Sequence, residues 1–425
     1  MLFGWDRLQT DEIVGVREAI VDPRRPTPGP FHLEIHPTNR CNLSCFYCSS
    51  HAHRAGEILP WDTLRPLLES HAKRGLRFLR LSGGGESLTY PEIDKLIELC
   101  AGLGLRFVDV TTNATTLETL ASPLIRAGTD CFSISLNEPD ERLYARATGR
   151  TPEMFHRAIR GIEAVAGIRE GLPPEERPQL HIKFFLWKDN AYRLEEAYRL
   201  GTTFGADKIV LSALYGIPPE SRIRPADYAR VKESLRAIVM QDAVKSGPRL
   251  AFNLSDESPE LQDFALGEQM RRGVMDNAKS EESALDSEDL RSEYCYMGWF
   301  SATVTAAGEV YPCCNFVGNP RKSLGNIRWR PLEEIWRGPR ADRFRREIRQ
   351  LLLLRGDIEP SRKFLRFLDP FCIAPRRCPF ACALCSPKFY HSVVAEFERR
   401  TPARDRLLAR TRNCLLRTAH RLRRS

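Results

Sequence analysis

The stretch NRCNLSCFYCSS, residues 39–50, places three cysteines within eight positions: Cys41, Cys45 and Cys48. Three thiols at a C-x3-C-x2-C spacing allow three interpretations: a zinc site completed by His51 or His53, incidental core thiols, or ligands of an iron–sulfur cluster. A closed zinc site requires four ligands. Three thiolates on a four-iron cluster instead leave one iron open to a small molecule. The count of three therefore favours the cluster.

Strand-like and helical segments alternate after residue 30. Six runs have the composition of strands: 31–37, 76–83, 105–113, 130–137, 180–187 and 207–214. The stretches between them, such as 60–75 and 91–104, are apolar at i, i+3 and i+4 and close with Gly. This alternation predicts right-handed βαβ units and a parallel sheet. Six units are too few for an eight-stranded barrel, so we expect an α/β fold, a partial (β/α)6 TIM-like barrel.

Polar or Gly-rich segments follow the first four expected strands. The cysteine triplet follows the first, GGGES (83–87) the second, TTNAT (111–115) closes the third, and SLNEPD (135–140) closes the fourth. In parallel α/β barrels the chemistry gathers in the loops after the carboxyl ends of the strands. We therefore expect these four segments to meet at one rim of the barrel.

The cysteine spacing and these segments resemble the radical S-adenosylmethionine (radical SAM) superfamily over about residues 31–215. The resemblance implies that Cys41, Cys45 and Cys48 bind a [4Fe–4S] cluster whose open iron is chelated by S-adenosylmethionine. It also implies cofactor contacts: Tyr47 beside the adenine, Gly84, Gly85 and Glu86 at the methionyl amino group, and Thr112, Asn113 and Ser135 at the ribose and carboxylate. The chain departs from the family pattern at Ala114 and Asn137, where glycine and aspartate are common.

The chemistry implied by this resemblance is radical C–H activation. In the family, one electron cleaves the sulfonium to methionine and a 5′-deoxyadenosyl radical, which abstracts hydrogen from an unactivated C–H bond. We therefore expect an oxidoreductase-like enzyme that acts on a peptide or small-molecule substrate and takes electrons from a donor such as flavodoxin or ferredoxin. Lys183, on the fifth expected strand, is either a rim residue that contacts substrate or a solvent-exposed lysine.

A second cysteine group lies between residues 295 and 385. Its opening, Cys295 and Cys313 around Gly308 in a C-x12-G-x4-C pattern, resembles the SPASM and twitch extensions of the superfamily. Two auxiliary clusters would need eight thiolates, and the region holds seven. We therefore expect one auxiliary [4Fe–4S] cluster, with a zinc ribbon as the alternative, because soft thiolates select zinc or iron–sulfur. The expected ligands are Cys295, Cys313, Cys382 and Cys385, with Cys378 and Cys372 in reserve.

Charge and composition divide the chain further. Residues 251–294 hold twelve acidic against four basic residues, and the 25 residues of 401–425 contribute +7 of the formal net charge of +9. The expected division is an N-terminal extension (1–30), the partial barrel (31–215), an acidic linker or insertion (216–294), a smaller cysteine-rich auxiliary-cluster domain (295–390) and a basic amphipathic helix (391–425). We expect this helix to dock on the protein's own surface or a partner, with a membrane surface as an alternative. Nucleic acid is an unlikely partner, because the rest of the chain is nearly neutral.

The expected location is the cytoplasm. The chain has no apolar run of the roughly 18–20 residues that a membrane span needs, and its first residues do not resemble a secretory signal. Thirteen cysteines, an odd number, suit metal binding in a reducing compartment better than a disulfide framework. The competing hypothesis is a binding module held together by zinc in both cysteine groups, with its Arg-rich tail on RNA or membrane phosphates.

Overall fold

The computed structural model describes residues 27–48, 50, 56–213, 219–244, 249–253, 261, 264–265 and 297–353. They belong to two compact units: the larger holds the described residues between 33 and 265 together with 304–308, and the smaller holds 27–32, 297–303 and 309–353. Several sequence predictions fall outside the described residues: Cys295, Cys372, Cys378, Cys382, Cys385, His51, His53 and the basic helix 391–425.

The larger unit is built on one sheet with the strand order β1-β2-β3-β4-β5-β6-β7. Its strands are β1 (His32–Ile35), β2 (Phe78–Leu81), β3 (Phe107–Thr112), β4 (Cys131–Ser135), β5 (Gln179–Leu186), β6 (Lys208–Ala213) and β7 (Arg249–Asn253). Neighbouring strands from β2 to β7 pair in parallel. The predicted parallel α/β sheet is therefore confirmed.

The sheet continues past the boundary predicted at residue 215. Helix α8 (Tyr228–Val244) is followed by β7, which pairs in parallel with β6. The first part of the predicted linker 216–294 is thus a further βα unit of the larger domain. The acidic composition that suggested a linker or insertion was counted over 251–294, and the described helix and strand lie almost entirely before that stretch.

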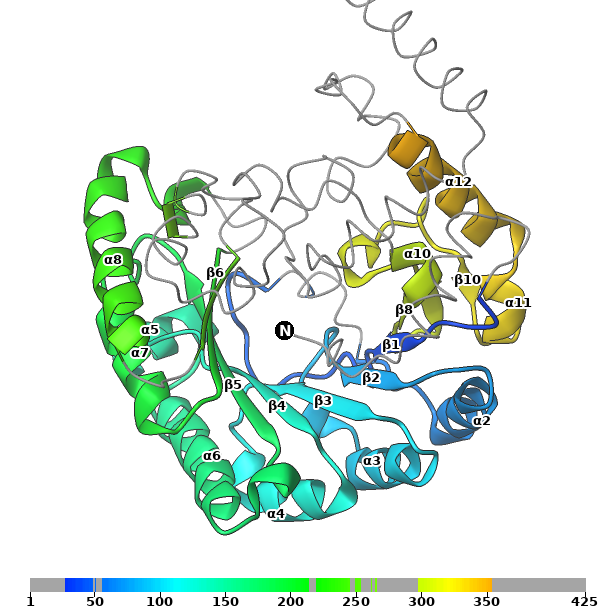
Figure 1. Cartoon of the computed structure of the whole chain (residues 1–425), viewed down its shortest axis with the longest axis horizontal. Coiled ribbons are helices and arrows are strands. Elements are labelled where there is room, and N and C mark those ends of the chain that lie inside the picture. Colours follow the sequence, from blue (N-terminus) through cyan, green and yellow to red (C-terminus); the bar gives the residue numbers. More distant parts are fainter. Residues whose placement is uncertain are drawn as a thin grey trace, which may run out of the picture. The chain divides into compact units, whose positions relative to one another are not determined.

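Helices lie along one side of this sheet (Figure 1). They are α2 (Trp61–Ala72), α3 (Ile93–Gly102), α4 (Leu117–Ala127), α6 (Glu153–Glu170), α7 (Leu194–Thr203) and α8. The packing is direct: a Cβ added to Gly201 of α7 would lie 2.6 Å from Ile209 Cδ1 of β6 and 4.0 Å from Phe184 Cε2 of β5. Ile209 and Phe184 therefore point toward the helices.

The two faces of the sheet differ in chemistry, because successive strand residues point to opposite sides. Buried apolar side chains alternate along the strands on the helix-covered face: Leu33, Ile35, Leu79, Leu81, Val108, Val110, Phe132, Ile134, Ile182, Phe184, Ile209 and Leu211. Polar side chains occupy the opposite face, called the inner face below: Glu34, Arg80, Asp109, Thr111, Ser133, His181, Lys183 and Lys208. The hydrophobic core thus lies between sheet and helices. The described inner face is thus mainly polar, with Val210 as a branched apolar exception in register with Lys183, whereas branched apolar side chains fill a closed barrel.

The smaller unit contains α10 (Met297–Phe300), β8 (Ser301–Val304), β9 (Glu309–Tyr311), β10 (Gly325–Asn326), α11 (Leu332–Trp336) and α12 (Pro339–Leu353). Within it, Thr27 Oγ1 donates to the carbonyl of Trp299 (3.1 Å), and Trp336 Nε1 donates to the carbonyl of Thr27 (3.1 Å). The described end of the predicted N-terminal extension therefore belongs to the same unit as 297–303 and 309–353. Cys313, buried, and Cys314, half-buried, follow β9 and form no disulfide.

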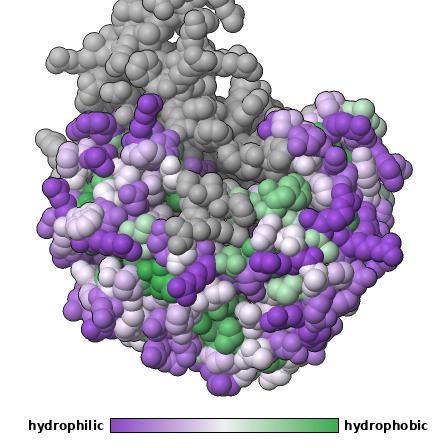
Figure 2. Space-filling model, turned by 180° about the vertical axis from the view of Figure 1, so that it is seen from behind, coloured by the Kyte–Doolittle hydropathy of each residue, from purple (hydrophilic) through white to green (hydrophobic). Residues whose placement is uncertain are grey.

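The visible surface in Figure 2 is mostly hydrophilic, with scattered apolar patches. Large apolar side chains exposed within the described ranges are Phe46, Met240 and Trp329. No helix among the described residues is both long enough and apolar enough to cross a membrane.

Candidate active site

The cysteine loop is held by helix α5 (Glu141–Thr148) through the backbone. The N–H groups of Ser44 and Phe46 donate to the carbonyls of Thr148 (2.8 Å) and Ala147 (3.0 Å). These carbonyls belong to the last turn of α5 and have no partner within their own helix. The loop therefore completes the helix end, and its backbone position is fixed by the protein itself.

The three cysteines of this loop are half-buried. The N–H of Leu43 lies 3.5 Å from Cys41 Sγ, in position to donate to a thiolate. The thiolates of a multi-iron cluster each bind a different iron. Soft, accessible sulfur donors on an anchored loop fit an iron–sulfur cluster.

The glycine segment packs against the chain that leads into the cysteine loop. Gly85 N donates to the carbonyl of Thr38 (2.9 Å), and Glu86 N donates to the carbonyl of Arg40 (2.7 Å). A Cβ on Gly85 would lie 1.9 Å from the Arg40 carbonyl oxygen, and one on Gly84, where φ is +67°, would lie 2.4 Å from Asn39 Oδ1. Glycine is required here so that two backbone segments can approach each other.

Glu86 is buried, and its carboxylate accepts hydrogen bonds from the chain. Thr112 Oγ1 (2.5 Å) and the N–H of Leu88 (3.2 Å) donate to Oε1, and the N–H of Asn113 (2.8 Å) donates to Oε2. Burial raises the pKa of Glu86, and these donors oppose the rise. The carboxylate thus joins the loops after β2 and β3, a structural role that sequence reasoning did not anticipate.

A second polar network links the cysteine loop to the loop after β3. Asn113 Nδ2 donates to Asn42 Oδ1 (2.8 Å), Asn42 Nδ2 donates to Thr115 Oγ1 (2.8 Å), and Thr115 Oγ1 donates to Asn113 Oδ1 (2.6 Å). Ala114, within this turn, has φ of +62°. This explains why a glycine would be suited to the position, since left-handed backbone favours glycine. The side chains of Thr112 and Asn113 are both engaged by the protein.

Tyr47 lies in an aromatic group at the same rim. Its ring is 5.0 Å from that of Phe46 and 5.8 Å from that of Phe185, and Phe46 is 5.1 Å from Trp187. The hydroxyl of Tyr47 and Oδ1 of Asn137 are both buried. Burial is the main cause that raises the pKa of Tyr47, and a hydrogen bond with the Asn137 side chain opposes the rise. The two polar side chains therefore meet at the edge of the aromatic group.

Ser135 ends β4 and is the candidate whose side chain is least engaged. The structure gives its hydroxyl no hydrogen bond within the described ranges, and the residue is half-buried. Of the three expected ribose and carboxylate contacts, Ser135 alone therefore keeps its polar group available.

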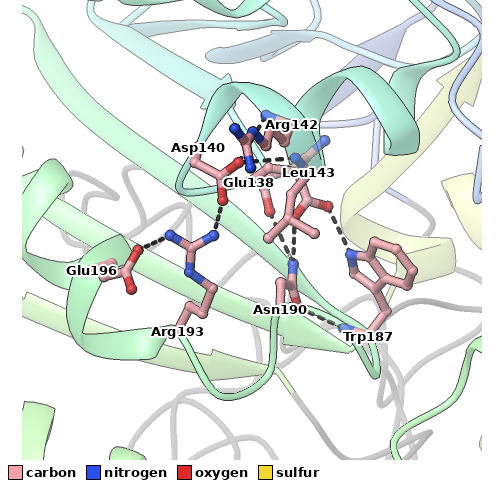
Figure 3. Close-up of polar contacts among 9 residues, drawn as sticks. Glu138, Asp140, Arg142, Leu143, Trp187, Asn190, Arg193 and Glu196 are labelled. Carbon is pink, nitrogen blue, oxygen red and sulfur yellow. Dashed lines mark hydrogen bonds and ion pairs between the residues drawn. The ribbon is translucent and has the colours of Figure 1, made fainter. Parts of the chain in front are cut away.

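Glu138 is a buried carboxyl that sequence reasoning missed (Figure 3). Trp187 Nε1 donates to its Oε1 (2.8 Å), and Asn190 Nδ2 donates to its Oε2 (3.0 Å). Burial raises the pKa of Glu138 to about 8. The bonds fasten the loop after β5 to the loop after β4, beside the aromatic group. An acidic residue in a rim segment was the available signal, but its partners lie about 50 residues away.

Hydrogen bonds and ion pairs of Asp140 and Arg193 add further contacts between the segments that follow β4 and β5 (Figure 3). Asp140 accepts from the N–H groups of Arg142 (2.8 Å) and Leu143 (3.0 Å) and so caps the start of α5. Arg193 pairs with both Asp140 and Glu196. The helix that carries the cysteine loop is thus fixed at both ends.

The inner face carries ionisable groups that sequence reasoning mostly missed. Arg80 pairs with Asp109 at 2.9 Å, and His36 Nε2 lies 3.3 Å from Glu34 Oε1. Lys183 belongs to the same face, in register with Ser135 at the end of β4. The signal was the period-2 alternation inside runs such as LRFLRLSG and LRFVDVTTN, which places polar residues on one face.

Comparison with known protein families finds two domain matches. Residues 35–169 match the radical SAM superfamily, and residues 295–354 match the SPASM iron–sulfur cluster-binding domain. The matches confirm the resemblance seen in the sequence and imply a [4Fe–4S] cluster, S-adenosylmethionine and auxiliary iron–sulfur binding.

The chain is also similar to individual proteins whose names state an activity. A probable GTP 3′,8-cyclase of Sulfurisphaera tokodaii is 29% identical over 50% of this chain and 64% of its own length. A PqqA peptide cyclase of Streptomyces rochei is 26% identical over 76% of this chain and 79% of its own. The structure of Streptococcus suis SuiB bound to its precursor peptide SuiA superposes with a TM-score of 0.56 at 19% identity, covering 77% of this chain and 70% of that one. The structural likeness shows the shared fold.

Proposed function

We propose that this chain, a radical SAM enzyme with a C-terminal SPASM domain, cleaves S-adenosylmethionine reductively and abstracts a hydrogen atom from a peptide or small-molecule substrate. The observation that carries the proposal is the rim itself. Three half-buried thiols on a loop anchored to α5 lie in the same unit as the Glu86 network and the Tyr47 aromatic group.

Cys41, Cys45 and Cys48 would hold the cluster. When bound, the cluster and S-adenosylmethionine supply the electron transfer and the 5′-deoxyadenosyl radical. The chain's own residues orient the cofactor: Tyr47 offers an aromatic wall, and Ser135 offers a hydroxyl.

Glu86 contributes to the cofactor site by holding the loops after β2 and β3 in position. Its carboxylate already accepts three hydrogen bonds from the protein, so its contribution to an ammonium group comes from remaining lone pairs. Gly84 and Gly85 contribute by letting the segment approach the 36–40 backbone. Gly84, Gly85 and Glu86 thus stay in the proposed cofactor site, and their first role is to position the loop after β2.

A peptide or a small metabolite remains the proposed substrate class. The peptide option draws on the PqqA peptide cyclase and on SuiB with its precursor peptide, and the small-molecule option on the GTP 3′,8-cyclase. A donor of the flavodoxin or ferredoxin class would supply the electron, and the cytoplasm would be its compartment. We further propose one auxiliary cluster, held by Cys295, Cys313, Cys382 and Cys385.

The test is anaerobic reconstitution with iron and sulfide, followed by incubation with dithionite and S-adenosylmethionine and quantification of 5′-deoxyadenosine. The wild type should form this product, and replacing Cys41, Cys45 and Cys48 together by Ala should abolish it. Cys100→Ala, which removes a buried thiol of α3, is the matched control and should retain it. Undiminished product from the triple variant would refute the assignment of the cluster ligands.

Metal analysis of the same variants tests the auxiliary cluster. The triple variant should keep about four irons per chain, the content of one cubane. About eight retained irons would indicate two auxiliary clusters. Zinc without iron in a colourless protein would support the zinc-held binding module instead.

A further inference from the structure

The inner face presents an ammonium group that no described side chain bonds directly. Lys183 is half-buried, and among the described residues its side chain has no hydrogen bond and no ion pair. The nearby carboxylates are each placed with another basic group: Asp109 with Arg80 at 2.9 Å, and Glu34 with His36 at 3.3 Å. An ammonium that is partly removed from water without a directly bonded counter-charge is unfavourable.

The charges that act on Lys183 come from three other strands of the sheet. Arg80 on β2 repels it, while the carboxylates Asp109 on β3 and Glu34 on β1 attract it. Burial first, and then the charge of Arg80, lower the pKa of Lys183 to about 8. Both carboxylates lie closer to another basic side chain, Asp109 to Arg80 and Glu34 to His36, than to Lys183.

The position of Lys183 ties it to the rim. Its carbonyl accepts a hydrogen bond from the N–H of Asn137 (2.9 Å), and it lies in register with Ser135. Phe185 follows two residues later on the same face, about 7 Å along the strand, and its ring contacts that of Tyr47. A group bound to Lys183 would therefore lie on the inner face next to the proposed cofactor site.

We propose that Lys183 binds an anionic group of the substrate, a carboxylate or a phosphate, on the inner face of the sheet. The inference rests on the proposed function, because it names the chemical class of the substrate that meets the radical. A carboxylate or phosphate accepts a charge-assisted hydrogen bond from the Lys183 ammonium. A peptide carboxylate and a phosphorylated metabolite share this chemistry.

The experiment measures binding of two probes, succinate and inorganic phosphate, by isothermal titration calorimetry. The full-length protein is reconstituted anaerobically and saturated with S-adenosylmethionine without reductant, so that the carboxylate site of the cofactor is filled and no cleavage occurs. The wild type should bind at least one probe at one site per chain. Tighter binding of succinate would identify a carboxylate, and tighter binding of phosphate a phosphoryl group.

Variants locate the site. Lys183→Met should raise the dissociation constant at least about tenfold, the loss of one charge-assisted hydrogen bond, and Lys183→Arg should restore it to within about threefold. Lys188→Met, five residues further along the chain, is the matched control and should bind as the wild type does. Lys183→Met should not lower the melting temperature, because the protein gives this ammonium no partner.

Failure of this inference is distinct from failure of the proposed function. A wild type that forms 5′-deoxyadenosine with dithionite but binds neither probe would overturn the anion site alone. Binding that survives unchanged in Lys183→Met would also overturn it. Absence of 5′-deoxyadenosine from the wild type would overturn the proposed function, whatever the calorimetry shows.

Discussion

In the rim loops the carboxyl groups of Glu86 and Glu138 are bonded by the protein, whereas on the inner face the Lys183 ammonium is not bonded by any described residue. Glu86 and Glu138 each accept two or more hydrogen bonds from the chain, and Asn113 joins a closed network with Asn42. The Lys183 side chain has no hydrogen bond among the described residues. Polar groups with all their hydrogen bonds made keep the loops in a fixed arrangement. A charged group that the described residues do not bond is suited to bind a ligand.

The largest expected effect tests whether the rim is held by backbone contact. Gly85→Ala places a Cβ 1.9 Å from the Arg40 carbonyl oxygen, so the two segments must separate. We expect a loss of about 3 kcal/mol or more in the free energy of unfolding, measured by denaturant titration. Gly102→Ala, where an added Cβ meets nothing within 4 Å, is the control and should not destabilise. Equal stability of the two variants would show that the Gly85 and Arg40 backbone segments can separate at little cost in free energy.

Glu86→Ala tests the structural part of the Glu86 role. It leaves Thr112 and the N–H groups of Leu88 and Asn113 without their acceptor, so we expect about 2–3 kcal/mol of destabilisation. Glu86→Gln retains one amide oxygen and should lose less. If Glu86→Ala weakens S-adenosylmethionine binding without any change in stability, the carboxylate serves the ligand rather than the loops.

The raised pKa of Glu138 makes the stability of the folded protein depend on pH. Its pKa is raised to about 8 by burial, so the folded protein retains a proton that the unfolded chain releases from about pH 4.5. Stability therefore falls as pH rises between these two values, by about 4 kcal/mol at pH 9 relative to pH 5. Melting temperatures across this range should fall further for the wild type than for Glu138→Gln, which cannot ionise. Parallel profiles would mean that Glu138 is ionised throughout.

The smallest expected effect concerns Ala114, the one alanine of the rim with left-handed backbone. Ala114→Gly relieves a φ of +62° but removes a buried methyl group, so we expect a net change below about 1 kcal/mol. Ala121→Gly in α4 removes an equally buried methyl group from ordinary helix and should cost more. A larger loss at Ala114 would show that methyl packing outweighs backbone strain there.

The local signals in the sequence were strong for some features and absent for others. Cys41, Cys45 and Cys48 lie within eight positions, so their spacing alone indicated a shared site. The alternation of strands and helices indicated the parallel sheet, because each element needs only the periodicity of its own residues. Glu138 gave no comparable signal, since its partners Trp187 and Asn190 come from the loop after the next strand.

The sequence by itself determined the βα order, the cysteine loop and the Gly-Gly-Glu segment, because these depend on residues close together in the chain. Only the tertiary structure decided which polar groups are already bonded. It placed Thr112 on Glu86 and Asn113 on Asn42, contacts that join segments 26 and 71 residues apart. It also placed Lys183 on the inner face, half-buried, since strand register, set by pairing with β4 and β6, fixes which face a side chain occupies.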